Sequence, residues 1–224
     1  MTTPLGQTGS KPAPGGLALV QAFVNTADLE TGRDALATPE GLRAWLGQNG
    51  LLDAHGRAKE SDRRRAIAVR EALRGLLLVN AGVLAADATR AHVATIEEAA
   101  ERGPLVVRFG EDGATRLEPA GGGVDGALGR LLAVVHDARV EGTWDRLKAC
   151  RNDDCHWAFY DHSKNRSGTW CTMAACGSRL KSRAYRQRQT AAEDAVTHHG
   201  ARPATRGGGT RRSPRGTDRG ASGG

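Results

Sequence analysis

The chain has 224 residues, 39% of them hydrophobic, and a formal net charge of +7, so it is long enough for one or two domains with a buried core. Leu, Ile, Val and Phe account for only 39 of the 224 residues, which argues against a chain that is folded throughout. No apolar run is long enough to cross a bilayer, and residues 1–15 lack the pattern of a secretory signal. We therefore expect a cytoplasmic protein that does not associate with membranes.

The apolar residues are concentrated in the middle of the chain. Positions 17–190 hold 37 of those 39 residues, whereas Gly, Pro, Ser and Thr dominate residues 1–15. A segment rich in Gly, Pro, Ser and Thr buries too little apolar surface to offset the conformational entropy that is lost on ordering. We predict a disordered leader, a helical domain, a second small domain and a disordered Arg/Gly-rich tail, with the bounds 1–15, 16–142, 143–190 and 191–224.

Apolar residues at helical spacing, together with capping and stop signals, predict five helices in the first domain. These helices span about 17–28, 39–48, 62–79, 87–102 and 124–141. Thr38 before Pro39 is a cap followed by a first-turn proline, and Ser61 is the expected cap of the third helix. On the third helix we expect the basic residues to face water; these are Arg63, Arg64, Arg65, Arg70 and Arg74.

Between the fourth and fifth helices the pattern changes to that of a hairpin. A β-rich run from Leu105 to Phe109 is followed by turn residues and by a second extended stretch from Ala114 to Leu117. The predicted fold class is therefore mainly α with a small β-hairpin. This domain contains only isolated histidines and lacks the glycine-rich loops that bind nucleotides, so we do not expect an enzyme.

All four cysteines of the chain lie within 27 residues, in the pattern Cys-x4-Cys-x15-Cys-x4-Cys. They are Cys150, Cys155, Cys171 and Cys176. Four thiolates arranged as two close pairs suit the tetrahedral coordination of zinc, because each pair can supply one edge of the tetrahedron. The sequence therefore predicts one structural Zn²⁺ ion.

Two alternatives to a four-cysteine zinc site remain open. Disulfides would also use paired cysteines, although a reducing compartment disfavours them. His156 and His162 lie close enough in sequence to replace a thiolate. Four thiolates already complete a closed shell with no position for a reactive water, which favours a structural site over a hydrolytic one.

The residues around the cysteines are those of a small domain organised by a metal ion. Six of the nine aromatic residues lie between positions 144 and 185, where so short a unit needs them as a core. We predict a strand at 157–161, a polar turn at 163–168 and a helix from Thr172 to about Gln189. This arrangement predicts a small zinc finger of treble-clef-like form after the helical domain.

The positive charge belongs to the C-terminal part of the sequence. Residues 177–224 contain eleven Lys and Arg against three acidic residues, whereas residues 1–176 carry a net charge of −1. A basic segment of this kind favours a polyanion, although it can also be a solvated surface. The candidate nucleic-acid contacts are Lys164, Arg166, Arg179, Lys181, Arg183, Arg186 and Arg188.

The segment from Cys150 to Arg188 resembles the CGNR zinc finger of bacterial proteins. The resemblance rests on the four cysteines and on residues between and after them, which include Phe159, Asp161, Ser163, Asn165, Arg166, Trp170, Met173, Gly177, Arg179, Lys181, Arg183, Tyr185 and Arg186. The family has Asn where this chain has Ser178. The resemblance implies a DNA-binding module.

The preceding segment is similar to the ABATE domain that accompanies this finger, a family described as stress-induced transcription regulators. The similarity rests on Asn25-Thr26 near the end of the first helix and on a hairpin before the last helix. Together the two resemblances cover about residues 17–190.

These observations predict a zinc-dependent, DNA-binding transcription regulator, with homodimerisation possible and the effector of the helical domain unknown. Two other functions stay open at this stage. The zinc unit could be a rigid module that binds an acidic protein partner, or it could bind RNA.

Overall fold

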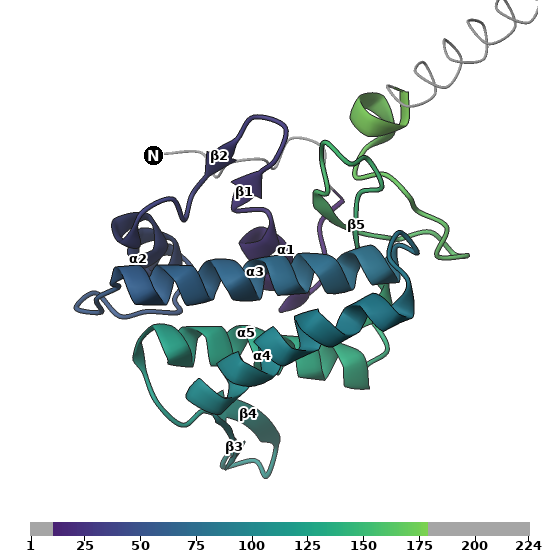
Figure 1. Cartoon of the computed structure of the whole chain (residues 1–224). Helices are drawn as coiled ribbons and strands as arrows, with labels where there is room; N and C mark the ends of the chain where they lie inside the picture. The colour runs from purple at the N-terminus through teal and green to yellow at the C-terminus, as the bar shows by residue number, and fades with distance from the viewer. Residues whose placement is uncertain (1–10, 179–224) are drawn as a thin grey trace, which may run out of the picture. The chain divides into compact units, whose positions relative to one another are not determined.

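The computed structural model describes residues 11–178, which all belong to one compact unit of the chain (Figure 1). The helices are α1 (Leu17–Val24), α2 (Pro39–Gln48), α3 (Glu60–Asn80), α4 (Thr89–Arg102) and α5 (Gly123–Val140), with 3-10 turns η1 (Ala86–Ala88) and η2 (Trp144–Arg146) and the π-type turn η3 (Met173–Gly177). Three antiparallel pairs of strands join β1 (Ala27–Asp28) to β2 (Arg33–Asp34), β3 (Leu105–Phe109) to β4 (Thr115–Pro119), and β5 (Leu147–Ala149) to β6 (Ala158–Tyr160). The mainly α fold with a small hairpin is therefore confirmed.

Helix α3 is the central element of the described fold. It contacts α1, α2, α4 and α5, and its C-terminal half also contacts β5 (Figure 1). The side chains that fill the core between these elements are almost entirely apolar; the fully buried ones include Val20, Phe23, Leu36, Leu42, Leu46, Leu73, Leu77, Leu128 and Leu131. Each buried Leu or Phe stabilises the fold by about 1.5–3 kcal/mol relative to an exposed one.

The helix starts agree with the sequence at α2 and differ from it at α3. Thr38 accepts a hydrogen bond from the Gly41 amide at 3.1 Å, as an N-cap residue does. Helix α3 begins at Glu60 rather than after Ser61, because Lys59 is its N-cap and the Asp62 carboxylate accepts from the Lys59 amide at 2.9 Å, which satisfies the helix start two residues earlier.

The first helix is shorter than predicted. It ends at Val24, and Asn25 is its C-cap residue. The residues that follow form the short strand pair β1–β2, which closes at Gly32 with a φ of +70°. Because α1 ends at Val24, the Asn25 side chain can form hydrogen bonds with a segment outside the helix.

Two arginines of α3 that were expected to face water are buried instead, with Arg70 4% and Arg74 3% exposed. Arg70 pairs with Asp34 at 2.7 Å and with Glu71 at 2.8 Å. Arg74 pairs with Glu71 at 2.9 Å and also donates to two backbone carbonyl oxygens. The prediction is wrong here because both arginines, besides Glu71 on their own helix, have partners in other segments of the chain.

The structure also differs from the expected leader at residues 11–13. The Tyr160 amide donates to the Lys11 carbonyl at 3.0 Å, and the Ala13 amide donates to the Gln21 side chain at 2.7 Å. Ala13 is buried, so this segment adds to the core although its composition is that of a loop. Residues 1–10 and the predicted tail at 191–224 lie outside the described residues. Within 11–178, no helix combines the length and the apolar character needed to cross a membrane.

Candidate metal centre

The first cysteine pair is carried by the β5–β6 hairpin. In this hairpin Leu147 pairs with Tyr160, Lys148 with Phe159, and Ala149 with Ala158. Since side chains alternate between the faces of a strand, Leu147, Ala149, Ala158 and Tyr160 face the helical core, while Phe159 packs against the cysteines. The same alternation directs Cys150 to the face of Phe159.

A tight turn brings Cys155 back towards Cys150. The Asn152 carbonyl accepts from the amides of Cys155 and His156 at 2.9 and 3.1 Å, and the Cys150 amide donates to the Trp157 carbonyl at 3.0 Å. His156 has a φ of 45°, a left-handed conformation that is uncommon for a residue with a side chain. The turn therefore holds both sulfur atoms on the same side of the hairpin, as the sequence pattern requires.

The second pair lies at the turn η3. Cys171 precedes it and Cys176 lies within it, and the Gly177 amide donates to the Thr172 carbonyl at 3.2 Å. The helix predicted from Thr172 thus starts as a π-type turn, and its continuation after residue 178 lies outside the described residues.

Ser178 occupies the position at which the CGNR finger has Asn. Its hydroxyl donates to the Met173 carbonyl at 3.0 Å, across the π-type turn. The Ser178 side chain therefore closes the turn.

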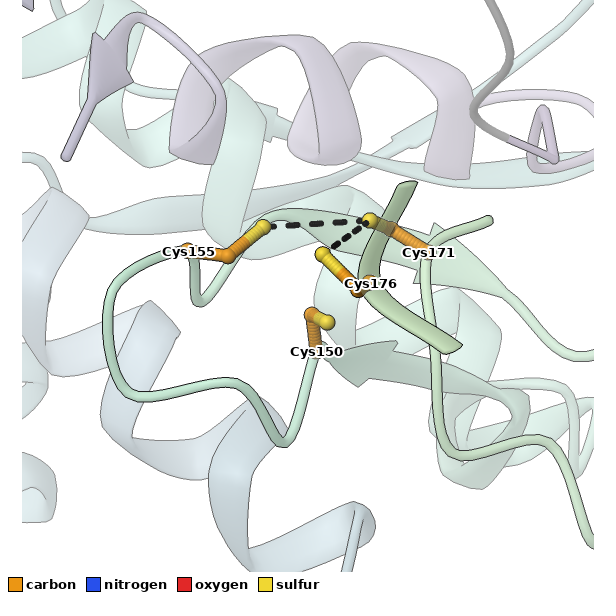
Figure 2. A group of neighbouring side chains, drawn as sticks. All are labelled: Cys150, Cys155, Cys171 and Cys176. Carbon is orange, nitrogen blue, oxygen red and sulfur yellow. Dashed lines mark hydrogen bonds between the residues drawn. The ribbon is translucent and has the colours of Figure 1, made fainter. Parts of the chain in front are cut away.

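The four sulfur atoms form a single cluster (Figure 2). All lie within 4.8 Å of one another, and the Cys155–Cys171 and Cys171–Cys176 sulfur distances are 3.8 and 3.7 Å. Zn–S bonds of about 2.3 Å give a tetrahedron with S–S edges of about 3.8 Å, so these spacings fit zinc. All four cysteines are buried, and none forms a disulfide. The cluster is able to bind one zinc ion.

The thiols of the cluster differ in pKa. Hydrogen bonds from the thiols of Cys155 and Cys171 stabilise the Cys150 thiolate and lower the pKa of Cys150. Their hydrogen bonds to Cys150 raise the pKa values of Cys155 and Cys171. The cluster therefore accepts a first thiolate readily and resists further ones, because the negative charges repel one another.

Zinc affinity is expected to fall as the pH is lowered, since zinc must displace the protons of Cys155 and Cys171. The raised pKa values of these two thiols mean that more than one proton is released per ion bound. Competition against a chelator of known pH dependence measures this slope. A zinc affinity that does not change with pH would contradict the assignment of thiols as the ligands.

The two histidines considered as substitute ligands lie outside the sulfur cluster. Among the described residues, the grouped metal-ligating side chains are the four cysteines. His162 interacts with the Pro12 carbonyl at 2.9 Å, and His156 lies 3.7 Å from the exposed Asp153 carboxylate. The buried Asn152 amide, which sequence reasoning missed, donates to the Cys176 sulfur at 3.7 Å.

A buried ion pair braces the loop between β6 and Cys171. The Lys148 ammonium lies 2.8 Å from the Asp161 carboxylate, with side-chain exposures of 7% and 0%. The same ammonium donates to the Arg166 carbonyl, and the Asp161 carboxylate accepts from the amides of Ser163 and Gly168. The Asp161 carboxylate thereby holds the two ends of the 161–168 loop close together. The sequence gives no clear signal for this pair, because Lys148 alternates with Leu147 and Ala149 as a solvent-facing strand residue would.

Of the seven candidate nucleic-acid contacts, the structure describes two. Lys164 and Arg166 are exposed on the braced loop, and the Arg166 guanidinium lies 3.8 Å from the Asp145 carboxylate. The other five lie outside the described residues: Arg179, Lys181, Arg183, Arg186 and Arg188.

Comparison with known families identifies both parts of the chain. Residues 146–189 match the CGNR zinc finger, and residues 17–141 match the ABATE family, described as "putative stress-induced transcription regulator". A search of curated proteins finds no match. The order of the two segments is the one that the sequence predicted. Because the ABATE match covers more than half of the chain, the protein belongs to the ABATE family and carries a CGNR zinc finger behind the ABATE segment.

Proposed function

We propose that this protein is a zinc-dependent transcription regulator that binds DNA through its C-terminal finger. The observation that carries the proposal is the location of the positive charge. Residues 177–224, which include the end of the finger, hold eleven Lys and Arg against three acidic residues. The family to which the chain belongs supports the regulatory role.

Zinc has a structural role in this proposal. Bound to Cys150, Cys155, Cys171 and Cys176, it would hold the two cysteine pairs together and so shape the finger. Four buried thiolates leave no coordination position for a substrate, and for this reason we do not propose an enzymatic reaction.

The basic residues have two proposed roles. Arg179, Arg183 and Arg186 make phosphate or groove contacts, while Lys164, Arg166, Lys181 and Arg188 add affinity that does not depend on sequence. Lys164 and Arg166 are suited to this because the buried Lys148–Asp161 pair fixes the loop that exposes them. In this role the protein acts in the bacterial cytoplasm, on the nucleoid. A footprint of two related half-sites would identify a homodimer.

The affinity for duplex DNA is expected to fall steeply with salt. Contacts to about six phosphates give a slope of about −5 in a plot of log affinity against log salt concentration. Mobility-shift titrations of the full chain at several salt concentrations measure this slope. Absence of any shift at moderate salt would favour the protein-interaction function, and stronger competition by single-stranded RNA than by duplex DNA would favour RNA binding.

Two paired variants test the exposed loop. Replacing Lys164 and Arg166 by Gln removes two candidate phosphate contacts and should reduce the magnitude of the slope by about 2. The matched control replaces Arg43 and Arg64, which are exposed on α2 and α3, and changes the net charge equally. Equal slopes for the two variants would remove Lys164 and Arg166 from the proposed interface.

A further inference from the structure

The turn that carries Cys155 is held by a buried side chain of the helical segment. Arg74 of α3 donates to the His156 carbonyl at 2.9 Å and to the Val24 carbonyl at 2.8 Å, and it pairs with Glu71 at 2.9 Å. Arg74 is 3% exposed, so these contacts are shielded from water. His156 follows Cys155 directly and has a left-handed backbone, so this guanidinium holds the His156–Trp157 peptide, one residue after a candidate metal ligand.

A second side chain of the helical segment binds the strand that follows the turn. Asn25, the C-cap residue of α1, donates to the Ala158 carbonyl at 2.9 Å and accepts from the Ala158 amide at 2.7 Å. Its amide thus pairs with the backbone of β6 much as a neighbouring strand would. Gln21 donates to the same Ala158 carbonyl at 3.1 Å.

The loop between the first two cysteines is also tied to the end of α3. Arg151 donates to the Ala81 carbonyl at 2.9 and 3.2 Å. Helix α3 therefore meets the loop at its C-terminal end and meets the Cys155 turn through Arg74.

These contacts matter because of the charge of the centre. A zinc ion with four thiolates carries two net negative charges, and here all four ligands are buried. A buried charge is stabilised by oriented hydrogen-bond donors and nearby cations, and such partners beyond the ligands also fix ligand positions. The charge of Arg74 is already paired with Glu71, so its contribution is positional: Arg74 and Asn25 together fix the backbone at His156 and Ala158, directly after Cys155.

We propose that the metal centre extends into the helical segment, with Arg74 and Asn25 as positioning residues that set how tightly the metal is held. The finger then retains its metal through contacts made by α1 and α3 as well as through its own cysteines. This proposal concerns metal binding and does not depend on whether the finger binds DNA.

The test compares Arg74→Gln with Arg70→Gln in the full chain. Both arginines are buried on α3 and pair with Glu71, but the contacts of Arg70 go to Asp34 and Thr26 and not to the cysteine turn. Arg74→Gln is expected to weaken zinc binding by about 10–100-fold, the usual effect of losing a partner beyond the ligands. Arg70→Gln is expected to lower Tm similarly while leaving zinc affinity within about threefold of the native value.

Two readouts separate positioning from stability: the rate of zinc release to a chromogenic chelator, and the visible spectrum of the Co²⁺-substituted protein. Arg74→Gln should speed release and shift the Co²⁺ bands, and Arg74→Lys, which keeps a cation, should recover part of the native rate. If Arg74→Gln and Arg70→Gln release zinc at the same rate and share the native Co²⁺ spectrum, the proposal is overturned.

A second pair of variants decides the matter if Arg74→Gln does not fold. Asn25→Asp removes the donor to the Ala158 carbonyl, and its control is Asn49→Asp, which changes the C-cap residue of α2. Faster zinc release from Asn25→Asp than from Asn49→Asp supports the proposal. Equal rates at equal Tm contradict it.

Discussion

Removal of zinc by a chelator is expected to lower the Tm of the helical segment as well as that of the finger. The strands β5 and β6 contribute Leu147, Ala149, Ala158 and Tyr160 to the same hydrophobic core as the helices, so loss of the metal also loosens that core. Free zinc at about a thousand times its Kd stabilises the folded chain by about 4 kcal/mol. For a domain of this size that corresponds to about 8–16 °C in Tm.

Circular dichroism at a helical wavelength measures this effect, because the described helices α1 to α5 all lie outside the finger. The Cys171→Ser, Cys176→Ser double variant should melt at the lower temperature from the start and should not respond to the chelator. Helices that melt at an unchanged Tm after complete loss of zinc would show that the finger and the helices are thermodynamically independent.

Asp161→Asn is expected to destabilise the protein by about 3–5 kcal/mol, since it leaves the buried Lys148 ammonium without its carboxylate. The expected decrease in Tm is about 6–20 °C. Asp145→Asn is the matched control, because the Asp145 side chain is 66% exposed and lies 3.8 Å from Arg166. Its loss should change stability by less than about 1 kcal/mol. Similar effects of the two variants in thermal melts would contradict the role given to the buried pair.

The Lys148–Asp161 ion pair also predicts how the stability of the protein changes at acidic pH. Burial alone would raise the pKa of Asp161, but the Lys148 ammonium and the amides of Ser163 and Gly168 lower that pKa well below the ordinary 3.8. A lowered pKa in the folded state contributes stability that is present above pH 3.8 and is lost as the pH falls below this value. In acid titrations the stability difference between the native protein and Asp161→Asn should therefore narrow below that pH.

The organisation of the site around its cysteines could be predicted because the signals are local in sequence. Four cysteines in two x4 pairs define a tetrahedral donor set without reference to the rest of the chain. Thr38 and the hairpin at Leu105–Phe109 are similar cases, since a cap and a turn depend on residues only a few positions apart. The clustering of the four cysteines, the cap at Thr38 and the hairpin are confirmed.

Burial of charged residues could not be predicted in the same way. Arg70 and Arg74 continue the 3-4 spacing of Ile67 and Leu77, so their helix positions are compatible with burial, and only their charge predicted that they face water. Their burial depends on Asp34, Val24 and His156, and the His156 carbonyl lies 82 positions from Arg74 in the chain.

The sequence by itself determined the mainly helical class, the pairing of the four cysteines and the concentration of positive charge after residue 176. Only the tertiary structure decided that the cysteine hairpin shares its core with the helices and that Asn25 and Arg74 hold the turn at Cys155. The physical reason is the separation in sequence over which each kind of interaction acts. Metal-ligand spacing and capping act over a few residues, whereas a buried hydrogen bond between distant segments exists only after packing has brought its partners together and excluded water.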